Sequence, residues 1–234
     1  MKSFEIADFR PRIMKDAMII EAIRPPPLPL LKRINVGIGV SSIHCLVLEF
    51  VDGSRRGLCL CSNNEPMPLI EENMRYRGGK WVDIERGNYI TCVSGYHSNR
   101  GSFLCHSIYL GMRFGSDLIF EVNLKESRGG AFHFNIDETS LVCNLIFLTN
   151  GTLASLGVFR TSLHLSLLPR HANLLPEIYE EHLTNILFLL SIIRVSNDNS
   201  LLAMPLEVRW RIVSFISGFE LVNADAVIIE NRSS

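Results

Sequence analysis

The chain contains 234 residues, of which 47% are hydrophobic and 20% are charged. This apolar share excludes an intrinsically disordered chain, because burial of so much hydrophobic surface offsets the entropy cost of ordering. The 23 Lys and Arg residues against 24 Asp and Glu residues give a net charge of −1. Nucleic acid is therefore disfavoured as a partner, because neutralising phosphates requires a surplus of basic side chains. The length corresponds to one or two domains.

Residues 1–33 are predicted to be an N-terminal amphipathic segment followed by a proline-rich linker. Apolar side chains recur at helical spacing from Ile13 to Ile23, and a run of prolines that ends at Pro29 then excludes a helix. The run favours a polyproline II spacer, although Pro26 and Pro29 also have the spacing of ligands for aromatic-lined grooves. The segment lacks the apolar stretch of a signal peptide, so we expect a cytoplasmic chain.

Residues 34–165 are predicted to form an antiparallel β domain. Short apolar stretches of alternating character follow one another at intervals of about ten residues, as in sandwiches, barrels and prisms. Asp-Gly and Asn-Gly pairs are strong hairpin signals. The turns expected from such pairs, and from a Gly-Gly pair, are at Asp52-Gly53, Gly129-Gly130 and Asn150-Gly151.

Residues 166–234 are predicted to be a small α-helical C-terminal region. Apolar residues follow helical spacing over 174–193, and a second helix is expected to begin at Pro205 and end at Gly218. No apolar run reaches the roughly 20 residues of a membrane-spanning helix, so no span is expected. The predicted fold class is mainly β, an antiparallel β-prism or sandwich, followed by this helical region.

Two stretches of the β region resemble jacalin-related lectins. The first is an apolar strand over 43–51 followed by Asp52-Gly53, and the second is the segment 84–96, which reads IERGNYITCVSGY. The resemblance implies a β-prism fold and carbohydrate binding. Lectins of this family hold sugar with a Gly-x-x-x-Asp loop, whereas VFRT follows Gly157 here. The resemblance therefore implies the fold more directly than the sugar site.

The segment 204–216, which reads MPLEVRWRIVSFI, resembles the first helix of an F-box. The resemblance implies docking onto the adaptor of a cullin-type ubiquitin ligase. The alternative is an amphipathic helix that only packs within the chain. The expected partner-binding residues are Pro205, Leu206, Val208, Ile212, Val213 and Phe215.

The segment 95–101, which reads GYHSNRG, is the most polar of the expected turns. Aromatic rings with polar tips, an amide and a guanidinium together supply the contacts that a sugar or a peptide needs. The alternative is a hydrated hairpin loop without a ligand. The expected ligand-binding residues are Tyr96, His97, Asn99 and Arg100.

No catalytic residue, metal ligand or cofactor is predicted. The sequence lacks a Gly-x-Ser-x-Gly elbow, a His-Glu-x-x-His helix and a phosphate loop, and its six cysteines form no C-x-x-C pair. We expect reduced thiols packed as small hydrophobic side chains. The sequence thus predicts a non-enzymatic binding module or adaptor that recognises a protein or a glycan and docks a protein partner. The alternatives are a carbohydrate-binding lectin and a hydrolase that uses His97 or His106.

Overall fold

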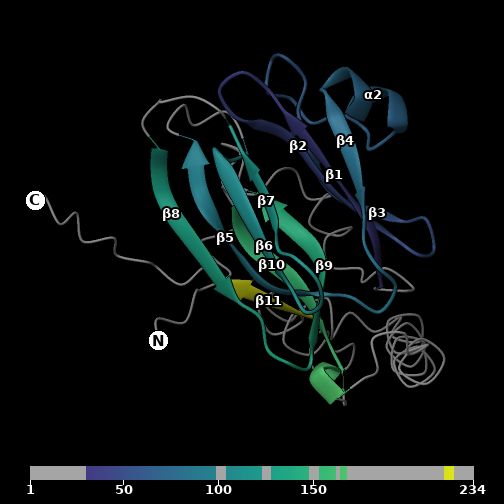
Figure 1. The fold of residues 1–234 in the computed structure, drawn as a ribbon. Helices are drawn as coiled ribbons and strands as arrows, with labels where there is room; N and C mark the ends of the chain where they lie inside the picture. Colours follow the sequence, from purple (N-terminus) through teal and green to yellow (C-terminus); the bar gives the residue numbers. More distant parts are fainter. Residues whose placement is uncertain are drawn as a thin grey trace, which may run out of the picture.

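Three antiparallel sheets make up the part of the chain that the computed structural model describes (Figure 1). The described residues are 30–98, 104–122, 128–147, 153–161, 164–167 and 219–223. The first sheet has the order β3-β2-β1-β4 and contains β1 (Leu31–Ile38), β2 (Ile43–Phe50), β3 (Arg55–Cys59) and β4 (Gly79–Asp83). The second has the order β7-β6-β5-β8 and contains β5 (Ile90–Ser98), β6 (Ser107–Met112), β7 (Leu118–Glu121) and β8 (Arg128–Asn135). The third has the order β11-β10-β9 and contains β9 (Ser140–Phe147), β10 (Leu153–Arg160) and β11 (Phe219–Asn223).

The three sheets surround one hydrophobic core. Strand β3 of the first sheet contacts β9 of the third, β11 of the third contacts β8 of the second, and β7 of the second contacts β1 of the first. Each sheet contributes fully buried side chains to the same cluster, such as Leu46, Phe134 and Leu156. The prediction of a mainly antiparallel β chain is therefore confirmed.

Strand β2 is buried on both faces, which is unusual for an antiparallel strand with a solvent-facing side. Alternate residues point to opposite faces of a strand. Leu46 and Leu48 lie in the shared core, whereas Cys45 and Val47 lie in a second cluster on the outer face of the sheet. This outer cluster consists of Cys45, Val47, Cys59 and Met74, with Met67, Leu69 and Trp81 packed against it.

A short helix, α2 (Glu71–Tyr76), covers the outer cluster and contacts β1 and β4 (Figure 1). The sequence does not predict this helix, because six residues are too few to show helical periodicity. Two acidic residues occupy its first turn and Arg75 occupies its last turn, which matches the direction of the helix dipole. Met74 is its buried residue and seals the cluster from solvent.

Part of the predicted helical C-terminal region is a strand. Residues Phe219–Asn223 form β11, which pairs antiparallel with β10, because an alternating segment here supplies the hydrogen bonds that an exposed strand edge lacks. A single 3-10 turn, η2 (Leu165–Leu167), follows the third sheet's central strand. The predicted N-terminal segment, the linker over 1–29 and the helices expected over 174–193 and 205–218 lie outside the described residues.

Gly57 in β3 is required by the close approach of β2. Its φ is +122°, and a Cβ atom at this position would lie 2.2 Å from the carbonyl oxygen of Leu46. Gly53, in the turn between the two strands, also has a positive φ of +82° but has no atom within 4 Å of a Cβ position. A side chain at Gly53 would therefore meet backbone strain alone, whereas a side chain at Gly57 would meet both backbone strain and a steric overlap.

Replacing Gly53 with alanine should lower the free energy of unfolding by about 1 kcal/mol, because only the left-handed backbone conformation is penalised. Replacing Gly57 with alanine should lower it by about 3 kcal/mol or more, because the overlap with a backbone atom is added. Urea unfolding followed by tryptophan fluorescence measures both. Equal losses in the two variants would contradict the packing of β3 on β2 described here.

Candidate functional site

Of the four ligand-binding residues predicted from the sequence, Tyr96 and His97 lie within the described residues. Strand β5 continues to Ser98, so Tyr96 and His97 are strand residues, and the pairing of β5 with β8 is irregular between Tyr96 and Ser98. The ring of His97 packs on Phe132 with a centroid distance of 4.8 Å. Burial lowers the pKa of His97. Asn99 and Arg100 lie outside the described residues.

The hydrolase alternative finds no support at His97 or His106. Nδ1 of His97 and both ring nitrogens of His106 are buried without a hydrogen-bond partner. A histidine that activates a nucleophile is hydrogen-bonded to that nucleophile and is oriented by a third group. Among the described residues, Nδ1 of His97 and both ring nitrogens of His106 make neither contact, so the described geometry does not favour nucleophilic catalysis at these atoms.

The predicted partner-binding residues Pro205, Leu206, Val208, Ile212, Val213 and Phe215 lie outside the described residues. Within the described part, no group of three or more His, Cys, Asp or Glu side chains is arranged to hold a metal ion. No described helix is long and apolar enough to cross a membrane.

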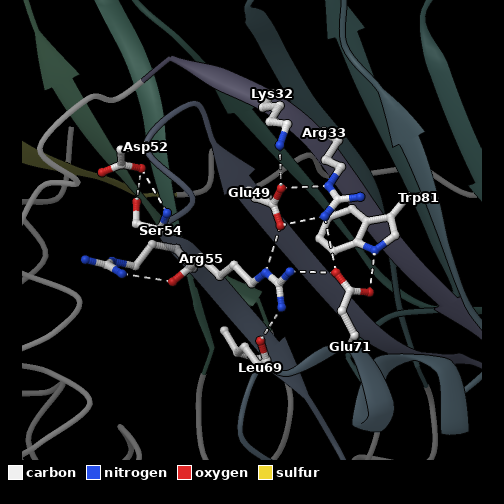
Figure 2. A network of polar contacts seen from close by, with 10 residues as sticks. Lys32, Arg33, Glu49, Asp52, Ser54, Arg55, Leu69, Glu71 and Trp81 are labelled. Atoms are coloured by element: carbon white, nitrogen blue, oxygen red, sulfur yellow. Dashed lines mark hydrogen bonds and ion pairs between the residues drawn. The ribbon is translucent and has the colours of Figure 1, made fainter.

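The densest polar cluster lies on the outer face of the first sheet, beside the outer cluster (Figure 2). Glu49 of β2 is its centre, and the side chain is only 3% exposed. Arg33 of β1 donates from Nε and Nη2 to both carboxylate oxygens, at 2.7 and 2.9 Å. Arg55 of β3 donates from Nε at 2.8 Å, and Lys32 donates at 3.3 Å. The register of the strands sets these contacts, because Glu49 is the cross-strand partner of both arginines.

Glu71 of α2 joins this cluster to the helix (Figure 2). Its Oε1 accepts from Arg33 at 3.2 Å and from Arg55 at 2.6 Å, and its Oε2 accepts from the indole N–H of Trp81 at 3.0 Å. The guanidinium of Arg33 also lies over the Trp81 ring, 4.0 Å from its centroid. We call this set of Lys32, Arg33, Glu49, Arg55, Glu71 and Trp81 the carboxylate clasp.

The electrostatics of the carboxylate clasp indicate a structural role. Burial alone would raise the pKa of Glu49, but the hydrogen bonds from Arg33, Arg55 and Lys32 outweigh it and lower the pKa to about 2. The hydrogen bond from Trp81, with smaller contributions from Arg55 and Arg33, lowers the pKa of Glu71. Three nitrogens of Arg55 are already engaged, the third by the Leu69 carbonyl at 2.9 Å. These contacts tie α2 to the sheet.

An open cavity of about 300 Å³ lies at the rim of the second sheet, where four separate segments meet. We call it the rim cavity. Its apolar walls are Ile90, Met112 and Ile136. Its polar walls are Tyr89 before β5, Thr91 within β5, Arg113 after β6, Asp137 and Glu138 in the turn between β8 and β9, and Ser166 of η2.

Hydrogen bonds between separate segments and within the β8–β9 turn fix the walls of the rim cavity. The buried amide of Asn88 donates to the Phe114 carbonyl at 2.8 Å and accepts from the Phe114 N–H at 2.9 Å. The Arg113 N–H donates to the Tyr89 carbonyl at 3.0 Å. Asp137 Oδ1 accepts from the N–H and the hydroxyl of Thr139, at 2.7 and 2.6 Å, which holds the β8–β9 turn. The polar groups are therefore presented by ordered backbone.

The charges around the rim cavity are of both signs. Burial raises the pKa of Tyr89, while the positive charge of Arg113 opposes and the negative charge of Glu138 assists this rise. The hydrogen bonds from Thr139 lower the pKa of Asp137. Among the described residues, the guanidinium of Arg113 has no hydrogen-bond or ion-pair partner, and it lies 5.8 Å from the centroid of the Phe114 ring.

Glu138, His164 and Ser166 form a contact series at the mouth of the cavity, but its order does not suit hydrolysis. Glu138 Oε2 lies 3.0 Å from Nδ1 of His164 and 3.5 Å from the hydroxyl of Ser166. In a nucleophilic triad the imidazole lies between the hydroxyl and the carboxylate. Here the carboxylate lies between the other two, so the serine hydroxyl contacts the carboxylate and not the imidazole, unlike in a triad.

Sequence reasoning missed every polar residue of the rim cavity. Asp137 and Glu138 follow a predicted strand, and Thr139 two residues after Asp137 is a local signal for a turn closed by a side chain. Nothing in the spacing links that turn to Arg113 or Ser166, because these residues come together only through the tertiary fold.

No model of a known protein family matches the chain, and no curated protein sequence matches it. Among solved structures, a crystal structure of lamprey immune protein is similar at a TM-score of 0.33 and 13% sequence identity. The matched region covers 56% of this chain and 33% of that chain. The chain thus spans about a third of that neighbour's length. Neither the jacalin-related nor the F-box resemblance is accompanied by a family match.

Replacing Glu49 with glutamine keeps the volume of the side chain but removes the charge that Arg33 and Arg55 share. The free energy of unfolding at neutral pH should fall by about 3 kcal/mol, because both guanidinium groups lose their buried counter-ion. The stability that the wild-type clasp supplies is complete above the ordinary glutamate pKa of 4.5 and is lost as the pH falls toward 2. E49Q should lack this part of the acid sensitivity.

Urea unfolding at neutral pH and at a series of acidic pH values measures both effects. The exposed Glu72 of α2 supplies the control, and E72Q should lose at most the roughly 0.3–1 kcal/mol of its helix-dipole interaction while keeping most of the wild-type acid sensitivity. An E49Q chain whose stability still falls as steeply as wild type below pH 4.5 would show that the carboxylate clasp does not carry this acid sensitivity.

Proposed function

We propose that the chain is a non-enzymatic binding module whose rim cavity holds a hydroxyl-rich group, such as one sugar unit of a glycan. The observation that carries the proposal is the cavity of about 300 Å³ lined by a phenol, a guanidinium, two carboxylates and two hydroxyls. Its volume is at the small end of the range of ligand sites, which favours a single small group.

The mixture of donors and acceptors supports a hydroxyl-rich ligand. Each sugar hydroxyl both donates and accepts a hydrogen bond, so it is matched by carboxylates that accept and by a guanidinium that donates. Among the described residues, both hydrogen bonds of Asp137 end on Oδ1 and both polar contacts of Glu138 end on Oε2, which leaves the other oxygen of each carboxylate for a ligand. The two carboxylates outnumber the one arginine, which disfavours an anionic ligand.

The arrangement of the sheets is consistent with this proposal. Three antiparallel sheets with contacting edges are what a β-prism requires, and the filled core confines a ligand to the rims. This supports the lectin interpretation of the sequence, but at the rim cavity and with residues other than the Tyr96 to Arg100 segment. A protein that presents a hydroxyl or cationic side chain to the same cavity is the competing ligand class.

Two variants test the rim cavity. Arg113→Met keeps the aliphatic stem over Phe114 and removes the charged donors, and Glu138→Gln removes the charge of one acceptor. A glycan array probed with the full chain identifies a ligand, and calorimetric titration then measures its affinity. Each variant should weaken binding about tenfold or more, because a hydrogen bond to a charged group contributes about 1.5–3 kcal/mol.

Matched controls are available on α2, which lies on the outer face of the first sheet and contributes no residue to the rim cavity. Arg75→Met and Glu72→Gln make the same chemical changes at exposed positions and should leave the affinity unchanged. An array without any binder, or affinity that survives both cavity variants, would refute the proposed ligand site.

We also propose that the segment 204–216 docks a protein partner, as its resemblance to an F-box helix implies. The observation that favours this is the position of β11, which pairs with β10 and so attaches the chain to the third sheet at Phe219, three residues after the segment. A docked partner would therefore be tethered directly to the β domain, as an adaptor requires.

The double variant L206A/I212A removes two apolar side chains of the expected docking stripe. Capture of a cullin-ligase adaptor by the purified chain should be lost, while glycan binding at the rim cavity should stay at the wild-type level. The variant Glu207→Gln, which leaves every apolar side chain of the stripe in place, is the control and should still capture the adaptor. Capture that survives L206A/I212A would contradict the docking role of this segment.

A further inference from the structure

Cys45 and Cys59 are cross-strand partners in the first sheet. Strand β2 pairs with β3 in a register that places the two residues opposite each other. The Leu60 N–H donates to the His44 carbonyl at 2.9 Å, just beyond the pair on each strand. Residues flanked in this way form a non-hydrogen-bonded antiparallel pair, in which the Cα atoms are about 4.5 Å apart. This separation is at the short end of the range of about 4.4–6.8 Å that a disulfide spans.

The surroundings distinguish these two thiols from the other buried cysteines. The Cys45 thiol donates to Oδ1 of Asn35 at 3.5 Å. Its neighbour Cys59 raises the pKa of Cys45, and Cys45 in turn lowers the pKa of Cys59. The positive charge of Arg77 acts in the same direction on Cys59, and Nε of this arginine is buried without a hydrogen-bond partner. Burial instead raises the pKa of Cys105 and of Cys143, so neither of these is disposed to form a thiolate.

The two thiols are covered by a few side chains of the outer cluster and not by the main core. Both thiols belong to the outer cluster, whose cover is Met74 of α2 together with the partly buried Met67 and Leu69. Cys61, two residues after Cys59, is already half-buried at the surface. A small oxidant therefore needs only local opening of the 61–76 segment to reach the sulfur atoms.

We propose that Cys45 and Cys59 form a redox-active dithiol, which hydrogen peroxide converts to a cross-strand disulfide. The Cys59 thiolate attacks peroxide, so that an S–O bond forms, the O–O bond breaks and hydroxide leaves to become water. The Cys45 sulfur then attacks the sulfenic acid, so that the S–S bond forms and the second oxygen leaves as water with the Cys45 proton. Two thiols lose two electrons in total, and one peroxide is reduced to two waters.

The test uses the full chain carrying Cys61→Ser, because trypsin then yields one cysteine in each relevant peptide, 34–55 and 57–75. The introduced hydroxyl retains an acceptor for the Glu65 N–H, which contacts the Cys61 sulfur at 3.3 Å in the wild-type chain. After peroxide treatment of the folded chain, mass spectrometry should find the two peptides linked, with the loss of two hydrogens, and a thiol reductant should separate them.

The variant C45S/C61S is the control for the resolving step. It should accumulate the Cys59 sulfenic acid, trapped as its dimedone adduct, severalfold above the level in C61S. Sulfinic or sulfonic acid at Cys59 without the linked peptide, equal dimedone trapping in the two variants, or thiols that stay reduced while wild-type Cys61 is oxidised would each overturn the proposal.

Discussion

The buried carboxylate of Glu49, held by Arg33, Arg55 and Lys32, is the interaction on which the outer half of the molecule depends. A charged group in this position is tolerated only because two guanidinium groups on the flanking strands satisfy both oxygens. Through Glu71 and Trp81 the same cations hold α2 against the sheet. The inner face of β2 meanwhile packs into the core shared by three sheets. Both faces of the first sheet are thereby closed.

The proposed ligand site lies at a rim of the sheets, away from both closed faces. The core is filled by side chains from all three sheets, and most donors of the clasp are engaged within the fold. The rim cavity differs in that its charges are of both signs, are only partly engaged and surround about 300 Å³ of open space. Rigid strands position its walls, and short turns supply most of its polar groups. This arrangement is common in β scaffolds, where loops on a rigid framework carry the binding residues.

The outer cluster also contains the pair of thiols proposed to be redox-active. Cys45 and Cys59 face each other beneath α2, so the layer that the carboxylate clasp fastens also controls access to a pair of thiols. Stability of that layer and reactivity of the thiols are consequently coupled. Weakening the clasp is expected to expose the dithiol before the shared core opens, because the two clusters lie on opposite faces of β2.

Local signals predicted the fold well and the candidate site poorly. Alternation and the Asp52-Gly53 turn predicted the β2–β3 hairpin, because both depend on neighbouring residues. Helix α2 and strand β11 were missed, since five or six residues show little periodicity and tertiary contacts decide their structure. Tyr96 and His97 were assigned to a loop, whereas both lie in strand β5. The rim cavity joins four distant segments, so no spacing along the chain could have revealed it.

The most direct test of the account is a nuclear magnetic resonance titration of the full chain with a glycan selected on an array. Ligand binding at the rim cavity predicts that amide shifts concentrate at residues 89–91, 112–114, 136–139 and 164–167. Shifts concentrated instead at residues 95–98, or on the outer face around Arg33 and Glu71, would contradict the assignment of ligand binding to this rim.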